Sequence, residues 1–340
     1  MVRVADDVMM AGEEERRMLV ESVAAYRGQA LDDYAQEMDE RPDSGRFDLA
    51  WKKLAELGLL DALVCEESGG QGMDIYSFCI VLRELAAGQA AVAAAVLSQN
   101  VALWALDVAG MLGDAGPIEE FGGGAARAGI AWPATGDGAF VPGGTAAGLI
   151  VLASEEGAVM KSAPGDPTVE VKELDYPLGL RGCRPAIVKA VGMEGLAGAP
   201  VVSPGAERAI ECRLLLGVTA IAAGITRQGW EKAAAYAAER FQGGDIIIKH
   251  EQIRMMLSAM EERLAVMEGA LATAASRERL DVAECRGLKA TACDMAMASA
   301  QDAVQVHGGY GYMRDYGVER LMRDAAYLRS YPRPRIATLT

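Results

Sequence analysis

The chain has 340 residues, of which 51% are hydrophobic and 24% charged, as in a soluble globular protein with a sizeable core. Its formal net charge of -15 repels phosphate backbones, which argues against a nucleic-acid partner. The six cysteines lack C-x-x-C spacing and the two histidines lie far apart, so we expect reduced thiols, a cytoplasmic protein and no metal site.

The first zone, residues 1–125, is predicted to be an N-terminal helical domain. Expected helices cover 13–37, 49–57, 75–88 and 90–110. Asp48 and Asp74 are placed to cap the second and third of these, and Gly58 ends the second. The N-terminus has no long apolar core of a signal peptide, and the apolar run 214–224 is too short to span a bilayer, so we expect no membrane segment.

The next two zones differ in period. Residues 126–203 contain short apolar runs bounded by Gly, Pro or Asp, which predict a small β domain with strands at 149–153, 157–161, 168–172 and 186–189. Residues 204–340 return to helical periodicity and predict a four-helix bundle. Its expected helices are 210–241, 246–277, 281–307 and 318–328.

Several motifs sharpen this reading. Residues 51–72 contain E-L-G-L and a glycine-rich loop, and residues 236–244 read Y-A-A-E-R-F-Q-G-G. Residues 305–312 read Q-V-H-G-G-Y-G-Y, followed by Y-G-V-E-R and R-D-A within 316–325. Over residues 13–330 the chain resembles the acyl-CoA dehydrogenase family. The resemblance implies a mainly α fold with a small β domain: an N-terminal helical domain, a reduced middle β domain and a C-terminal four-helix bundle.

The resemblance also implies a place for FAD. In the family, the arginine turn and the glycine turn clasp the adenosine-diphosphate half of FAD held by the neighbouring subunit. The residues that carry this role over are Arg240, Gln305 and Gly309, with Phe241, Gln242 and Gly308 in support. A guanidinium can bind a pyrophosphate bidentately, and glycines let a ligand approach the backbone. Taken alone, the same residues also fit a helix-dipole partner and a helix stop.

Other motif residues are expected to be structural. His307 stands where the family tolerates many residues, so we expect it to pack rather than to act as a base. The pairs Glu319–Arg320 and Arg323–Asp324 are expected to form ion pairs that hold the last helix in place.

The catalytic base of the family is missing. That base is a glutamate, which removes the α-proton of the acyl-CoA while flavin N5 takes the β-hydride. The Y-E-G-T position of this glutamate is occupied by Pro332, and the alternative position on the long bundle helix by Leu214. Glu211 lies one turn before Leu214 and could replace the missing base if the alignment shifted by three residues. The alternative is that Glu211 is an ion-paired carboxylate without a catalytic role.

The β domain is also reduced. Around residues 131–137 we find only a stub of the family's T-E-P-x-x-G-S-D strand, which grips the flavin ring. The losses predict a non-catalytic subunit that completes the FAD site of a full-length partner, as in heterotetrameric bacterial acyl-CoA dehydrogenases. Several of those act on bulky or steroid-derived acyl-CoA, and electron-transfer flavoprotein accepts electrons in the family. The alternatives are a self-sufficient dehydrogenase with a relocated base and a flavin-free structural homologue.

Overall fold

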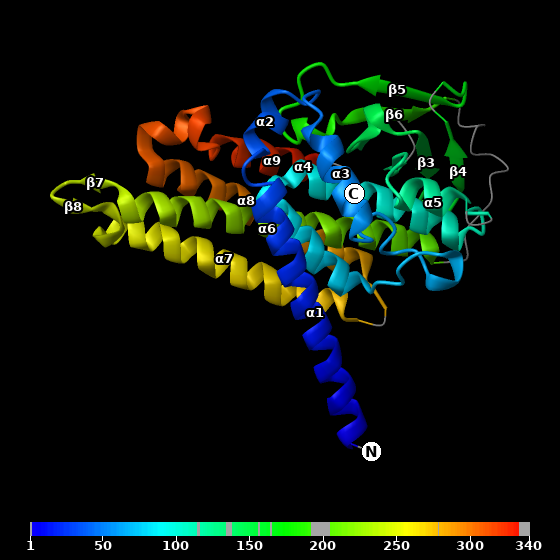
Figure 1. Cartoon of the computed structure of the whole chain (residues 1–340), viewed down its shortest axis with the longest axis horizontal. Coiled ribbons are helices and arrows are strands. Elements are labelled where there is room, and N and C mark those ends of the chain that lie inside the picture. The colour runs from blue at the N-terminus through cyan, green and yellow to red at the C-terminus, as the bar shows by residue number, and fades with distance from the viewer. Residues whose placement is uncertain are drawn as a thin grey trace, which may run out of the picture.

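The computed structural model describes residues 2–113, 116–133, 138–155, 157–163, 165–191, 205–277 and 279–332; side chains are described from residue 12 onward, 116 and 117 excepted. The N-terminal part is helical. Its helices are α1 (Val2–Ala30), α2 (Ala35–Glu40), α3 (Arg46–Glu56), α4 (Ile75–Val108) and α5 (Gly116–Gly122). In Figure 1 the start of α1 projects away from the body of the molecule.

The helix ends test the predicted caps. The Asp74 carboxylate accepts from the Ser77 amide at 3.0 Å, which confirms Asp74 as the N-cap of α4. The prediction for Asp48 is wrong, because α3 begins earlier, after Gly45 in a left-handed conformation, and Asp48 lies in the first turn. Gln89 has non-helical φ/ψ, so the two expected helices 75–88 and 90–110 are the arms of the kinked α4.

The middle part forms two three-stranded sheets. Their strands are β1 (Ala128–Ala131), β2 (Ala139–Val141), β3 (Leu149–Ala153), β4 (Val159–Ser162), β5 (Val169–Glu173) and β6 (Ala186–Ala190). The sheet orders are β1-β3-β4 and β2-β6-β5, with only the β1–β3 pair parallel. The four predicted strands are present within two residues of their expected bounds, and β1 and β2 lie outside those four predictions. Residues 134–137, part of the expected stub, lie outside the described residues.

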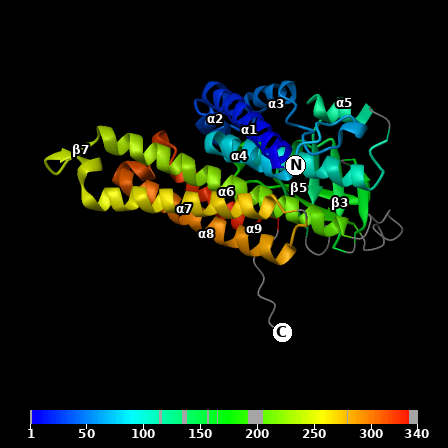
Figure 2. The ribbon, with the colours of Figure 1, turned by 90° about the horizontal axis from the view of Figure 1, so that it is seen from below.

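The C-terminal part is the expected bundle of long helices, and it confirms the mainly α fold class with a small β middle domain. Its helices are α6 (Ala206–Glu239), α7 (Glu251–Ala275), α8 (Val282–His307) and α9 (Glu319–Ser330). A short hairpin, β7 (Phe241–Gln242) with β8 (Asp245–Ile246), joins α6 to α7. Figure 2 shows the N-terminal helices stacked on one side of this bundle.

The two ends of the bundle are structurally distinct. The strands of the β domain gather at one end of the long helices, and the β7–β8 hairpin lies at the opposite end (Figures 1 and 2). Helix α6 has 34 residues and therefore extends about 50 Å between these ends.

Helices α4 and α6 form the apolar centre of the molecule. Both are long and apolar enough to cross a membrane by length and composition, but 89% of the most apolar window of each is buried inside the protein. The length argument from the sequence is therefore wrong, because the apolar run belongs to a helix long enough to span a bilayer. Its burial inside the protein marks it as a core helix.

Candidate functional site

A pocket of about 980 Å³ opens at the hairpin end of the bundle. It lies between the C-terminal ends of α6 and α8 and the β7–β8 turn. Five of the six predicted FAD-contacting residues line it together: Arg240, Gln242, Gln305, Gly308 and Gly309. Phe241 is not part of this lining and is 65% exposed. Residues 65 positions apart in the sequence thus meet in one concave surface of the size that small ligands occupy.

Arg240 supplies a cation to this pocket. It is the C-cap residue of α6, and its carbonyl accepts from the Ile247 amide at 2.8 Å, which fixes the backbone between helix and hairpin. Its guanidinium carbon lies 5.4 Å from the centre of the Tyr310 ring, and its Nε is buried without a hydrogen-bond partner. A donor left unpaired at a ligand-sized pocket fits an anionic group such as a pyrophosphate.

The glycine turn after α8 forms a second wall. Gly308 has φ 59° and ψ -134°, a conformation that favours glycine and ends the helix. A Cβ built on Gly308 or Gly309 would meet no atom within 4 Å, whereas one on Gly311 would lie 2.9 Å from the Val304 Cα. Internal packing therefore explains Gly311 but leaves the surface of Gly309 open to a ligand.

His307 packs against neighbouring residues, as expected, and it also borders the pocket. It is buried, its Nδ1 contacts the Ala303 carbonyl at 2.8 Å, and its ring stacks on Tyr236 at 4.4 Å. Burial lowers the pKa of His307, so the ring is neutral at physiological pH and Nδ1 is the donor.

Both usual base positions lie in sealed core. Leu214 has 0% exposure, as do Leu97 and Val218 nearby in the core formed by α4 and α6. The two helices approach so closely that a Cβ on Gly217 would overlap the Leu97 side chain. Pro332 is buried beside Tyr331, which is 1% exposed. Neither position offers a side chain that could accept a proton.

Glu211 is held by a specific partner. Its carboxylate accepts from Arg286 Nε at 2.7 Å and from Nη2 at 2.9 Å, joining α6 to α8. Both side chains border a second, smaller pocket of about 420 Å³ at the β-domain end, together with Trp132. Both carboxylate oxygens of Glu211 therefore accept charge-assisted hydrogen bonds from Arg286.

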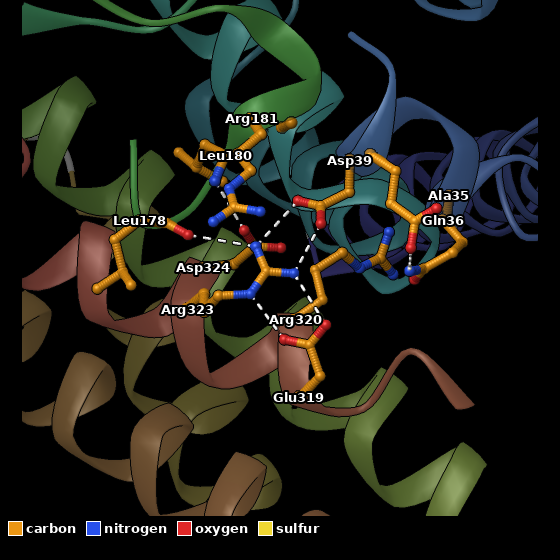
Figure 3. Close-up of polar contacts among 12 residues, drawn as sticks. Ala35, Gln36, Asp39, Leu178, Leu180, Arg181, Glu319, Arg320, Arg323 and Asp324 are labelled. Carbon is orange, nitrogen blue, oxygen red and sulfur yellow. Dashed lines mark hydrogen bonds and ion pairs between the residues drawn. The ribbon is translucent and has the colours of Figure 1, made fainter. Parts of the chain in front are cut away.

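Figure 3 shows how α9 is anchored. Arg323 forms the ion pairs here: it reaches Glu319 at 2.7 Å and Asp39 of α2 at 2.6 Å. The expected pairing of neighbours, Glu319 with Arg320 and Arg323 with Asp324, is therefore wrong. In a helix, residues four apart share a face and adjacent residues do not.

Asp324 and Arg320 point inward from the same helix. The Asp324 carboxylate accepts from the Leu180 amide at 2.7 Å, and Arg320 Nη2 donates to Gln228 at 3.3 Å. Burial raises the pKa of Asp324 to about 6, against the opposing effect of Arg320. These contacts tie α9 to the β-domain loop and to α6, so the motif residues serve the junction of three parts of the fold.

Two family profiles match the chain: "Acyl-CoA dehydrogenase, C-terminal domain" over residues 213–332 and "Acyl-CoA dehydrogenase, N-terminal domain" over residues 13–112. Together they cover about two thirds of the sequence. The chain belongs to the acyl-CoA dehydrogenase family. Members of this family are FAD-dependent oxidoreductases, so acyl-CoA dehydrogenation is its general chemistry.

Individual relatives agree with this assignment. Cyclohex-1-ene-1-carbonyl-CoA dehydrogenase of Syntrophus aciditrophicus (strain SB) is 28% identical over 96% of this chain and 88% of its own length. An acyl-CoA dehydrogenase of Bacillus subtilis (strain 168) is 38% identical over 34% of this chain and 31% of its own. Glutaryl-CoA dehydrogenase from Mycobacterium smegmatis matches in fold, with a TM-score of 0.81, 17% identity and 94% and 91% coverage of the two chains.

Sequence reasoning missed part of the pocket wall. Tyr310, Gly243 and His250 also line it, and His250 Nε2 contacts the Gln242 carbonyl at 2.9 Å. Tyr310 lies inside the recognised Q-x-x-G-G-x-G-Y motif, so its aromatic character was a usable signal. No motif marked His250, which reaches the pocket only because the hairpin folds back.

Proposed function

We propose that this chain is a non-catalytic subunit of a heteromeric, FAD-dependent acyl-CoA dehydrogenase. It completes the FAD site of a full-length partner subunit by holding the adenosine-diphosphate end of the cofactor. Arg240 and the Gln305 to Gly309 turn would hold this end, with Gln242 beside them. FAD, when bound, supplies the hydride acceptor for α,β-dehydrogenation of an acyl-CoA.

The main support for this proposal is that the candidate FAD pocket and the β domain lie at opposite ends of α6. The predicted adenosine pocket and the chain's own β domain stand at opposite ends of a helix about 50 Å long. One cofactor bound at Arg240 is too short to reach this β domain. The β domain that faces the flavin ring must then belong to another chain, so the pocket fits a shared site at a subunit interface.

The base positions support a non-catalytic role. Leu214 and Pro332 have no side chain that can accept the α-proton, and both are enclosed by packed core. The partner would supply the glutamate, the flavin-ring strand and the acyl pocket. A bulky or steroid-derived acyl-CoA is the substrate class we assign to the complex. Electrons would pass to an electron-transfer flavoprotein in the cytoplasm.

Two alternatives make different predictions. A self-sufficient dehydrogenase would use Glu211, which does border a pocket of about 420 Å³. Its bidentate contact with Arg286 opposes that role. A flavin-free structural homologue would leave the unpaired Arg240 Nε and the open Gly309 surface without a purpose.

Expression of this chain alone, and together with a full-length relative encoded beside it, tests the proposal. We expect little FAD and no dehydrogenase activity from the chain alone. The complex should be active and contain about one flavin for every two chains. Yellow, active protein from this chain alone contradicts the proposal, and a colourless, inactive complex favours the structural homologue.

A further inference from the structure

Arg213 is a partly exposed cation of the α4–α6 core whose charge no described carboxylate balances. Its guanidinium carbon lies 3.6 Å from the centre of the Trp104 ring. Its Nη1 makes one long contact of 3.3 Å with the Ala209 carbonyl, and its Nε is buried without a partner. None of the ion pairs among the described residues involves it.

Other arginines on the same two helices are arranged differently. Arg83 of α4 and Arg227 of α6 both pair with the fully buried Glu84. The acidic residue one turn beyond Trp104 is Asp107, and it accepts from Ser68 Oγ at 2.5 Å and from the Cys65 amide at 3.3 Å. The carboxylate closest in sequence to the Trp104 ring is therefore engaged with a loop rather than with Arg213.

The environment makes an unpaired cation costly. Burial lowers the pKa of Arg213 to about 10, and the thiols of Cys212 and Cys79 act in the opposite direction. A guanidinium that is partly desolvated and stacked on an indole keeps its planar fork free for a carboxylate or phosphate. Both Arg213 and Trp104 remain partly exposed, so a small anion can reach them.

We propose that Arg213, which lies over the Trp104 ring, binds an oxyanion, either a carboxylate or a phosphate. The site is separate from the FAD-contacting pocket, because Arg213 lies near the start of α6 and Arg240 at its end. It adds a recognition site for an anionic group to a chain that has no base of its own. In the complex, the oxyanion would belong to the acyl group or to the coenzyme A part of the substrate. This assignment of its source rests on the proposed function, whereas the binding site itself does not.

Anion binding to the purified chain, without FAD and partner, tests the site. Arg240→Gln serves as the background in every protein, so that the second cation does not contribute. Isothermal titration and quenching of tryptophan fluorescence are followed with inorganic phosphate, coenzyme A, acetate and glutarate at constant ionic strength. We expect saturable binding with a change in fluorescence, because Trp104 lies against the binding residue.

Arg213→Gln is the test variant and Arg208→Gln the control, since Arg208 is 76% exposed and its ion pair with Glu207 is long, at 3.7 Å. Loss of Arg213 should weaken binding about tenfold or more, and loss of Arg208 should not. Preference for phosphate and coenzyme A assigns the site to the coenzyme; preference for glutarate over acetate assigns it to a carboxylated acyl group. Absence of saturable binding, or equal binding by Arg213→Gln, overturns the proposal.

Arg213→Lys covers the case in which Arg213→Gln does not fold. It keeps the charge but loses the planar fork and the stacking surface, so binding should fall while the chain stays folded. Unchanged affinity in Arg213→Lys also overturns the site. These measurements involve no flavin, whereas the proposed function is judged by flavin content and activity of the complex, so each can fail without the other.

Discussion

The Arg286 guanidinium grips the Glu211 carboxylate with two hydrogen bonds, of 2.7 and 2.9 Å, between α6 and α8. Glu211 is the carboxylate closest in sequence to the lost base position Leu214. The side chain that comes nearest to a substitute base is thus part of an interhelical ion pair.

The first prediction concerns this pair. Glu211→Gln should leave dehydrogenase activity of the complex unchanged and lower the free energy of unfolding by about 1 kcal/mol, because Arg286 is half exposed and its lost partner is partly replaced by water. Urea unfolding and initial rates measure the two effects. Glu284→Gln, which breaks an exposed pair with Arg277, is the control. A large loss of activity in a folded complex would instead establish Glu211 as the base.

The second prediction concerns the cation of the adenosine pocket. Arg240→Ala should reduce the FAD content of the purified complex and raise the dissociation constant for FAD at least about tenfold, because a charge-assisted contact to the pyrophosphate is lost. Flavin absorbance and equilibrium dialysis measure the effect. Arg17→Ala, which removes a cation with 67% exposure on α1, should change neither. Unaltered flavin content in Arg240→Ala would place the cofactor elsewhere.

The third prediction uses the open glycine surface. Gly309→Val should place a side chain where a Cβ meets no atom within 4 Å, so it should lower flavin content while the isolated chain keeps its stability within about 1 kcal/mol. Gly269→Val on α7 introduces the same side chain where nothing lies within 4 Å either, but away from the pocket. Equal flavin content in both variants would mean that the glycine turn only ends the helix.

These predictions depend on residues that the sequence located through local patterns. The strand 149–153 was predicted with its observed bounds, because a short apolar run without internal Gly or Pro, close to Gly148 and Gly157, favours a strand. Arg240 and Gly309 were predicted together only because the two motifs share one FAD-binding role in the family that the chain resembles. Periodicity alone places each at a helix end and says nothing of their sharing a pocket.

The contacts that the sequence could not predict are long-range. Arg323 pairs with Asp39, which is 284 residues earlier, and no local rule selects one acidic residue among 48. The start of α3 was misplaced because Asp48 is a good cap by residue type, while Gly45 provides the left-handed turn that begins the helix. Side-chain chemistry predicted the type of contact, and packing of the three parts chose the partners.

The fourth prediction is a pH dependence at α9. The folded-state pKa of Asp324 is raised from 3.8 to about 6 by burial, so the folded chain binds more protons than the unfolded chain between these values. Stability from this group is therefore lost as pH rises from about 4 to 6. Three charges act on Asp324: Arg320 and Arg323 lower its pKa, and Asp39 raises it, but burial has the largest effect.

Asp324→Asn removes this titration and keeps an oxygen that can accept from the Leu180 amide. Relative to the variant, the wild-type chain should lose about 2 kcal/mol of unfolding free energy between pH 4.5 and 7.5, as the carboxylate becomes charged in the core. Urea unfolding of both proteins at several pH values measures the difference. A wild-type chain that gains stability over Asp324→Asn as pH rises would show that Arg320 fully compensates the buried charge.

The last prediction tests how closely α4 and α6 pack, which is what seals the lost base position. A Cβ on Gly224 would overlap the Arg83 carbonyl oxygen of the α4 backbone and would lie 2.6 Å from the Ala86 Cβ. Gly224→Ala should therefore destabilise the chain by about 1–3 kcal/mol despite the better helix propensity of alanine. Gly287→Ala, on an exposed face of α8 with nothing within 4 Å, should instead stabilise it by up to about 1 kcal/mol. Urea midpoints of the two variants measure both effects, and changes of opposite sign would separate close packing from helix propensity. A stabilised Gly224→Ala would mean that α4 and α6 are further apart and that Leu214 has room beside it for an acyl chain.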